Sequence, residues 1–202
     1  DADPAVYAFW KSVTQYSDEI LHLLESTPIT IDEWFKWRSI LRNERDANLV
    51  EKGFATLFMN RTNRSGILKA GVIGGKQQTG IYKLDARFNK GDIALRIIEI
   101  AKRKNDISVY CEDSLSLLSN CSKFLPEKSL IYLDPPYYIK GKGLYRNYYK
   151  HDDHVAISKV IQQSNFKYPW VVSYDNTEEI CFMYQMSKSL SYGLNYSAQR
   201  RY

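Results

Sequence analysis

The chain has 202 residues, of which 44% are apolar and 25% are charged, a composition ordinary for a soluble globular protein. This length suits one sizeable domain, with or without an insertion, and no segment approaches the ~20 apolar residues of a membrane span. The formal net charge of +5 mildly favours an anionic partner. The three cysteines are too few and too scattered for a disulfide framework or a zinc site. We therefore expect buried free thiols in a reducing compartment, no metal centre and a cytoplasmic location.

The first ninety residues predict helices and one long loop. A single helix is expected over residues 4–25, with Asp3 as its N-cap and Pro4 at its first position. A second helix is expected to open at Thr30, and a third to cover residues 49–59. The span 60–80 contains five glycines and no apolar periodicity, which predicts a loop. Loops of this length within a compact chain are usually functional or mobile.

From residue 93 onward, predicted helices and strands alternate. Strands are expected over residues 107–111, 130–133, 170–174 and 190–196, and helices over residues 93–104, 114–118, 151–163 and 178–183. Asp152, Asp153 and His154 read as a helix N-terminus with solvated charges. The alternation predicts an α/β fold with a largely parallel sheet. Residues 27–90 lack strands of this type and look like an insertion.

The stretch SLIYLDPPYY, residues 129–138, is the strongest candidate for a functional site. A short apolar run leads into Asp134, and two prolines then end the strand because neither can donate a ladder hydrogen bond. In open α/β sheets, ligands bind beyond the carboxyl ends of strands. A carboxylate and a neighbouring backbone carbonyl can together accept both hydrogens of an exocyclic amine, and Tyr137 offers a ring on which a planar base can stack. The alternative is structural, because Asp before Pro is a common turn former.

Four stretches of this chain resemble one family. LDPPYY is similar to the DPPY motif of amino-group DNA methyltransferases. The narrower resemblance is to the Dam-like, D12-class adenine-N6 DNA methyltransferases, and it rests on NRTNRSGI at residues 60–67, VSYDN at residues 172–176, and LNYS at residues 194–197 with Arg200 and Arg201. The resemblance covers nearly the whole chain, and its motifs occur in the family's order.

This resemblance implies a fold and an activity. The fold would be a Rossmann-like S-adenosylmethionine-dependent methyltransferase sheet, formed by residues 1–26 and 91–202, with an inserted, mostly helical target-recognition region at residues 27–90. The activity would be direct transfer of a methyl group from S-adenosylmethionine to the amino group of an adenine flipped out of double-stranded DNA. A monomer is expected, and a restriction endonuclease of the same system is a candidate partner.

The resemblance also assigns roles to individual residues. Asp134 and the Pro135 carbonyl would grip the adenine amino group, Pro136 would complete the rigid turn, and Tyr137 would stack on the flipped base. Cofactor contacts are implied for Asp1, Asp134 and Asp113, with Glu112 as the near alternative to Asp113. DNA contacts are implied for two groups of residues: Arg61, Arg64, Ser65 and Lys69 in the insertion, and Lys140, Lys142 and Arg146 in the tyrosine-rich loop after the motif. The alternative for the first group is a solvated basic turn.

Three elements of the family are missing from this sequence. A glycine-rich loop after the first strand and an N-terminal element before that loop would both precede Asp1, and a C-terminal strand would follow Arg201. We therefore expect the chain to be incomplete at both ends. The second hypothesis is a catalytically incomplete DNA-binding fragment or a degenerate methyltransferase module. An amino-methyltransferase that acts on RNA or protein is the third.

Overall fold

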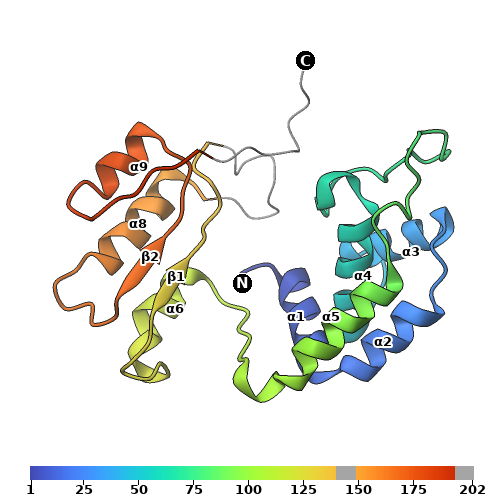
Figure 1. Ribbon diagram of the computed structural model, residues 1–202, viewed down its shortest axis with the longest axis horizontal. Helices are drawn as coiled ribbons and strands as arrows, with labels where there is room; N and C mark the ends of the chain where they lie inside the picture. The colour runs from blue at the N-terminus through green and yellow to red at the C-terminus, as the bar shows by residue number, and fades with distance from the viewer. Residues whose placement is uncertain (140–148, 194–202) are drawn as a thin grey trace. The chain divides into compact units, whose positions relative to one another are not determined.

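The structure is a computed structural model that describes residues 1–139 and 149–193 (Figure 1). The chain forms two compact units, here called unit 1 (Asp1–Cys111) and unit 2 (Glu112–Tyr202). Among the described residues, the helices lack the combination of length and apolar composition that a membrane span requires. Unit 1 consists of five α-helices and two short 3-10 turns, Arg64–Gly66 and Lys104–Asp106; the α-helices are α1 (Pro4–Gln15), α2 (Ser17–Ser26), α3 (Ile31–Leu41), α4 (Leu49–Thr62) and α5 (Lys90–Lys102).

Local sequence signals explain where these helices begin. Asp3 accepts a hydrogen bond from the Ala5 amide at 2.9 Å, and Pro4 needs no amide partner at the first position of α1. Asn48 and Glu51 form a reciprocal capping box at the start of α4, with both bonds at 2.9 Å. Such caps satisfy amides that have no partner within the helix, so these starts could be read from the sequence.

The prediction of a single helix over residues 4–25 is wrong, because the helical conformation is interrupted at Tyr16. Tyr16 has φ −133° and ψ 43°, which lie outside the helical region, and α2 begins at the next residue. Just before the break, the Thr14 hydroxyl donates to the Trp10 carbonyl at 2.9 Å, and side-chain bonds of this kind bend helices. The break lets Ile20 and Leu24 of α2 join the same buried core as Val13 of α1.

Helix α4 lies at the centre of unit 1. Its Phe54 and Phe58 are completely buried, and the Trp37 ring of α3 packs edge-on against Phe54 at 4.7 Å between centroids. Gly53 permits a close approach of α1, because a Cβ atom there would lie 2.6 Å from the Ala8 carbonyl oxygen. Aromatic packing on one side and close backbone contact on the other therefore hold α4 in place.

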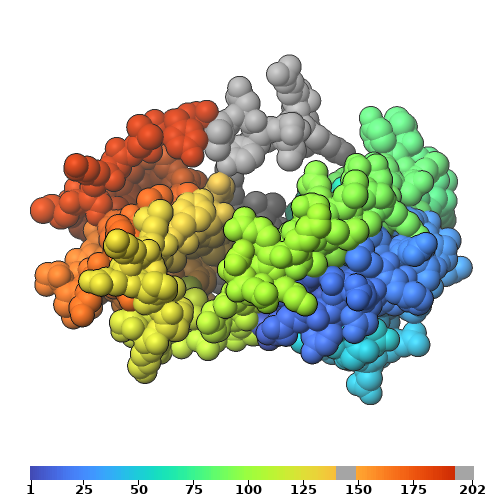
Figure 2. All heavy atoms as spheres, turned by 60° about the horizontal axis from the view of Figure 1, so that its bottom comes forward, coloured from blue at the N-terminus to red at the C-terminus, as the bar shows by residue number. Residues whose placement is uncertain are grey.

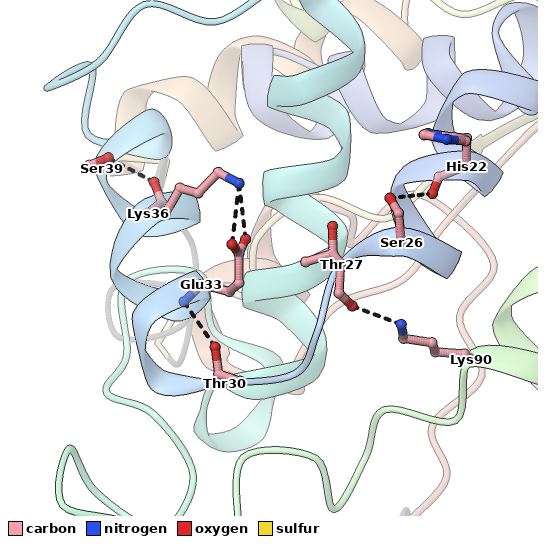
Figure 3. Close-up of polar contacts among 8 residues, drawn as sticks. All are labelled: His22, Ser26, Thr27, Thr30, Glu33, Lys36, Ser39 and Lys90. Atoms are coloured by element: carbon pink, nitrogen blue, oxygen red, sulfur yellow. Dashed lines mark hydrogen bonds and ion pairs between the residues drawn. The ribbon is translucent and has the colours of Figure 1, made fainter.

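Helix α5 is tied to the turn between α2 and α3. The Lys90 ammonium group donates to the backbone carbonyls of Glu25 at 2.8 Å and Thr27 at 2.7 Å, as Figure 3 shows for Thr27. Thr30 then caps α3 by accepting from the Glu33 amide at 3.3 Å. Figure 2 shows α5 lying along the N-terminal helices with its outer side exposed. These bonds fix the start of α5, which carries one of the arginines described below.

Unit 2 is a small α/β body. Its strands β1 (Ile131–Leu133) and β2 (Trp170–Val172) pair in parallel, with Ile131 opposite Trp170 and Leu133 opposite Val172. One face of this pair packs against α8, whose Ile157 and Ile161 are buried (Figure 1). The other elements within the described part of this unit are α6 (Ser114–Asn120), a 3-10 turn (Cys121–Lys123), α8 (His151–Ile161) and α9 (Glu178–Met183). Two strands with helices between and after them confirm a mixed α/β chain with a parallel sheet.

One expected strand is not observed, because residues 107–111 form no strand. The strand expected over residues 190–196 lies only partly within the described chain: residues 190–193 are outside any strand, and residues 194–196 are not described. A strand requires hydrogen bonds to a neighbouring strand, and β1 and β2 pair only with each other in the described sheet. The complete Rossmann-like sheet therefore stays a prediction.

The predicted division into domains is also untested. Residues 1–26, expected to belong to the catalytic domain, pack in the same unit as the helices of the expected insertion. Within residues 27–90 the structure describes helices, turns and one isolated bridge between Asn63 and Val72. Compactness does not reveal which segment was inserted, so the inserted recognition region stays a prediction.

Candidate active site

Asp134 follows β1 directly and is exposed. Alternation along a strand places it on the same side as Tyr132, away from the face that packs on α8. The Ser173 hydroxyl, at the end of β2, donates to Asp134 Oδ1 at 2.7 Å. Because a serine has only one hydroxyl hydrogen, its 3.1 Å bond with Tyr132 requires the tyrosine to donate. One carboxylate oxygen of Asp134 is thus fixed by β2, and no described residue bonds the other.

The segment after Asp134 is held by a second side chain from the same region. Pro135, Pro136 and Tyr137 are half-buried. Asp175 then accepts two backbone hydrogen bonds, from the Tyr138 amide to Oδ1 at 2.7 Å and from the Ile139 amide to Oδ2 at 3.0 Å. The Asp-Pro-Pro-Tyr segment is therefore anchored at both ends by residues that follow β2.

Beside this segment, three tyrosines surround a buried histidine. The ring centroids of Tyr138, Tyr149 and Tyr174 lie 5.3, 5.3 and 5.4 Å from that of His154, which is only 1% exposed. A hydrogen bond of 2.8 Å joins His154 Nδ1 to the Tyr174 hydroxyl, and no described residue bonds Nε2. Burial lowers the pKa of His154, so the ring is neutral near pH 7.

The expectation of a solvated His154 is therefore wrong. Its position in α8 explains why, because His154 shares the helix face of Ile157, Ser158 and Ile161, all of which are buried. The helix start itself was read correctly, since Asp153 accepts from the Lys150 amide at 2.8 Å. Burial raises the pKa of Tyr174 above its ordinary value, so this hydroxyl is also neutral.

The carboxylates expected to contact the cofactor occupy both units. In unit 2, Glu112 is exposed, and Asp113 uses Oδ1 to cap α6 by accepting from the Leu115 amide at 2.9 Å. In unit 1, Asp1 Oδ1 accepts from the Asp3 amide at 2.8 Å. Their roles toward a cofactor stay predictions. No group of three or more His, Cys, Asp or Glu residues in the described ranges could hold a metal ion. The expectation of buried thiols is wrong for Cys111 and Cys181, which are exposed, whereas Cys121 is buried.

In unit 1, Asn63 organises the expected DNA-binding loop. It is completely buried, accepts from the Trp34 indole at 2.7 Å, and donates to the carbonyls of Ile67 at 3.0 Å and Leu68 at 3.1 Å. The loop also contains residues with positive φ, among them Ser65 at 54°. Asn63 thus joins α3 to the loop and gives the loop a defined shape.

An arginine cluster lies at the base of this loop. It is composed of Arg61 from α4, Arg87 from the segment before α5, and Arg96 from α5. Burial lowers the pKa of Arg61, and the charges of Arg87 and Arg96 lower it further. Arg61 Nε is buried without a hydrogen-bond partner among the described residues, while Arg87 Nη1 donates to the Asn63 carbonyl at 3.4 Å. No carboxylate in the described ranges forms an ion pair with these arginines. Arginines gathered without counter-charges suit an anion such as a phosphate.

The other expected DNA contacts are placed only in part. Arg64, Ser65 and Lys69 are exposed on the loop, and the Arg64 side chain passes so close to Gly71 that a Cβ there would lie 3.0 Å from Nη2. Outside the described residues lie the expected contacts Lys140, Lys142 and Arg146, the tyrosines Tyr145 and Tyr148, and the terminal LNYS with Arg200 and Arg201. Their roles stay predictions.

Sequence reasoning gave no individual role to Ser173, Asp175, Arg87, Arg96 or His154. Only His154 had a usable signal, because its spacing from Ile157 and Ile161 is that of one helix face. Ser173 and Asp175 belong to the VSYDN motif, but a short motif does not reveal which distant groups its side chains contact. Arg87 and Arg96 carried no signal, since an isolated arginine does not reveal its distant neighbours.

These features define a class of protein: a basic α/β chain with an Asp-Pro-Pro-Tyr segment at the carboxyl end of a parallel strand, which is the arrangement expected of an amino-group methyltransferase. The sequence model of the D12 class N6 adenine-specific DNA methyltransferase family matches residues 1–197. The chain therefore belongs to this family of DNA adenine methyltransferases, which confirms the resemblance seen in its motifs. No curated protein gave a significant match.

Proposed function

We propose that this protein is a site-specific adenine-N6 DNA methyltransferase that transfers a methyl group from S-adenosylmethionine to a flipped adenine. The observation that carries the proposal is the Asp134 carboxylate, exposed at the end of β1 and bonded by Ser173 through Oδ1 only. Oδ2, which no described residue bonds, can accept a hydrogen of the adenine amino group. The Pro135 carbonyl would accept the second hydrogen, and Tyr137 would stack on the base.

In this mechanism the chain acts by positioning. Two acceptors on the amino hydrogens would orient the nitrogen lone pair toward the methyl carbon. The nitrogen would bond to that carbon as the bond between the methyl group and the sulfur breaks, so a neutral thioether would leave and no covalent enzyme intermediate would form. Partial positive charge develops on that nitrogen in the transition state, where the negative charge of Asp134 is stabilising. The proton released from nitrogen would pass to Asp134 or to solvent. None of these steps requires a nucleophilic cysteine.

S-adenosylmethionine would supply an electrophilic methyl group when bound. Carboxylates are suitable partners for the amine and hydroxyl hydrogens of its adenosine part. Glu112 is exposed, and Asp113 keeps Oδ2 free of the cap it forms with Oδ1. These residues fit the chemistry of the cofactor, and they are the ones we propose to bind it, together with Asp1 and Asp134.

The arginine cluster supports DNA as the substrate. Arg61, Arg87 and Arg96 face no carboxylate within ion-pair distance among the described residues, so an anion would neutralise their mutual repulsion. We propose that they bind backbone phosphates, and that Arg64, Ser65 and Lys69 lie where the loop meets the duplex. Binding to phosphates gives affinity and register, whereas base-edge contacts would select the sequence.

The direct test is N6-methyladenine formation in duplex DNA by the complete protein. We expect wild-type protein with S-adenosylmethionine to form this product, and Asp134→Asn to lower kcat on the order of 10³-fold, because the amide group would present a hydrogen to the substrate amine. Mass spectrometry of digested DNA measures the product. Glu127→Gln, an exposed carboxylate outside the site, is the matched control and should methylate normally.

Two outcomes would contradict the proposal. Asp134→Asn with wild-type activity would remove the catalytic role of this carboxylate. Wild-type protein that binds duplex DNA but never methylates it would favour the alternative, a DNA-binding module with a degenerate site. A cytoplasmic location, a monomeric state and a partner restriction endonuclease are further predictions, which follow from the family resemblance and composition alone.

A further inference from the structure

Two side chains at the end of β2 hold the Asp-Pro-Pro-Tyr segment, and we name them the β2 clamp: Ser173 and Asp175. Ser173 bonds the Asp134 side chain at 2.7 Å, on one side of Tyr137. Asp175 bonds the Tyr138 and Ile139 amides at 2.7 and 3.0 Å, on the other side. The clamp therefore encloses the three residues between its anchor points, Pro135 to Tyr137.

The chemistry of this segment explains why it needs such anchors. Neither proline has an amide hydrogen, so the segment cannot be held there by ladder bonds as a strand would be. Asp175 supplies a negatively charged acceptor to the two amides that follow Tyr137. Hydrogen bonds to a carboxylate are shorter and stronger than bonds between neutral groups, and the 2.7 Å contact is of that kind.

The clamp acts on different atoms at its two ends. Ser173 donates its only hydroxyl hydrogen to Asp134 Oδ1, which fixes the carboxylate and leaves Oδ2 for a substrate. Asp175 holds the backbone at Tyr138 and Ile139. Through this backbone it would restrict the direction of the Pro135 carbonyl and the position of the Tyr137 ring. Both anchors come from one short stretch after β2, so they cannot move independently of the strand that pairs with β1.

The geometry points to Asp175 as a positioning residue for methyl transfer, with Ser173 as its partner at the carboxylate. This inference rests on the proposed function, because it assumes that Asp134, the Pro135 carbonyl and Tyr137 contact the adenine. Asp175 itself need not touch the substrate. It keeps these three groups at their mutual distances, and a displacement of about 1 Å at a reacting centre can cost on the order of 10²-fold in rate.

The test replaces the clamp residues one at a time in the complete protein. In Asp175→Asn one acceptor oxygen remains while the amide group repels the second backbone hydrogen. We expect kcat to fall by roughly 10- to 100-fold, while KM for DNA and for S-adenosylmethionine changes by less than about twofold. Hydrogen exchange of the Tyr138 and Ile139 amides should accelerate in the same variant. Asp152→Asn, an exposed carboxylate in the first turn of α8, is the matched control and should change neither quantity.

A second pair of variants tests the other end of the clamp without altering Asp175. Ser173→Ala should lower kcat about tenfold, and Ser173→Thr, which keeps a hydroxyl and suits an extended chain, should restore most of it. If Ser173 served only the stability of the fold, its removal would not lower kcat while leaving KM unchanged, and Ser173→Thr would not restore kcat. If Asp175→Asn fails to fold, as judged by circular dichroism, the two Ser173 variants alone decide whether the β2 clamp positions the Asp-Pro-Pro-Tyr segment.

The outcomes separate this inference from the proposed function. If amide exchange accelerates in Asp175→Asn while kcat stays at the wild-type value, the positioning role is overturned, even when Asp134→Asn lowers kcat on the order of 10³-fold as the proposed function requires. A drop in activity of Ser173→Ala that Ser173→Thr does not reverse would equally overturn the role of the hydroxyl. If Asp134→Asn is fully active, the proposed function is wrong. The positioning role of the clamp is then wrong as well, because it assumes that Asp134 contacts the adenine.

Discussion

The two units hold their functional residues by different means. Among the described residues, the buried core cluster of unit 1 contains eighteen members and that of unit 2 contains five, with half-buried neighbours around both. In unit 1, this large core fixes the helices α4 and α5, which carry Arg61 and Arg96 of the arginine cluster. The Asp-Pro-Pro-Tyr segment of unit 2 is fixed mainly by hydrogen bonds from the β2 clamp.

This difference indicates where substitutions should act. Apolar burial is non-directional and contributes chiefly to stability, so changes inside unit 1 should appear in the free energy of unfolding. Hydrogen bonds are directional and add little net stability, so changes at the clamp should appear in the rate of methylation. The following predictions test this contrast, in order of decreasing expected effect.

The largest effect is expected for Phe58→Ala in the core of unit 1. Phe58 is completely buried in α4, and removing its ring should lower the free energy of unfolding by about 3–5 kcal/mol. Urea unfolding followed by circular dichroism measures this loss. Phe35→Ala is the control, because Phe35 is 43% exposed and its loss should cost below about 1 kcal/mol. If both variants lost a similar free energy of unfolding, the claim that the buried core stabilises unit 1 would be wrong.

The next effect tests the close approach of α1 and α4. In Gly53→Ala the new Cβ would lie 2.5 Å from Ser12 Oγ and 2.6 Å from the Ala8 carbonyl oxygen. We expect a loss of about 1–3 kcal/mol by overpacking, although alanine is about 1 kcal/mol better than glycine in a free helix. Gly91→Ala in α5, with its nearest atom at 3.5 Å, should be neutral or stabilising. A stabilised Gly53→Ala protein would contradict the packing.

The arginine cluster offers a test that depends on charge rather than packing. Arg61→Gln should weaken binding to duplex DNA of any sequence by roughly tenfold and reduce the slope of log affinity against log salt by about 1. Titrations at several salt concentrations give both quantities. Arg103→Gln is the matched control, since this exposed arginine already pairs with Asp106 at 3.3 Å. An unchanged slope for Arg61→Gln would place the phosphate contacts elsewhere.

The smallest effect concerns the buried histidine of unit 2. The pKa of His154 is lowered by burial, so below about pH 6.5 the unfolded chain takes up a proton that the folded chain resists. Stability therefore decreases as the pH falls, because the unfolded state binds more protons. His154→Gln should lose part of this acid sensitivity, measured by urea unfolding between about pH 7.5 and 5.5. The exposed His22→Gln should keep it, and identical profiles for wild type and His154→Gln would contradict a buried neutral ring.

The elements most faithfully predicted are those defined by neighbouring residues. The helix expected over residues 178–183 is observed as Glu178–Met183, with Thr177 accepting from the Ile180 amide at 3.3 Å. The apolar run before Asp134 forms β1, which two prolines follow. Capping and turn chemistry act across three or four residues, so one stretch of sequence contains the whole signal.

The failures occurred where distant segments decide the outcome. The strand expected over residues 107–111 has the right local pattern but no neighbouring strand among the described residues. Tyr16 interrupts a continuous helical pattern, and the break brings Ile20 into the core of α1. Local propensity is a weak prior, and tertiary packing overrides it.

The sequence by itself determined the family, the Asp-Pro-Pro-Tyr segment and the identity of its acid, because these depend on residue types in a short row. Only the tertiary structure decided which residues hold that segment and which arginines meet. Ser173 reaches Asp134 across 39 residues, and Asp175 reaches Tyr138 across 37. Such contacts exist only because β1 and β2 pair in parallel register, and pairing between distant strands is set by the packing of the whole unit.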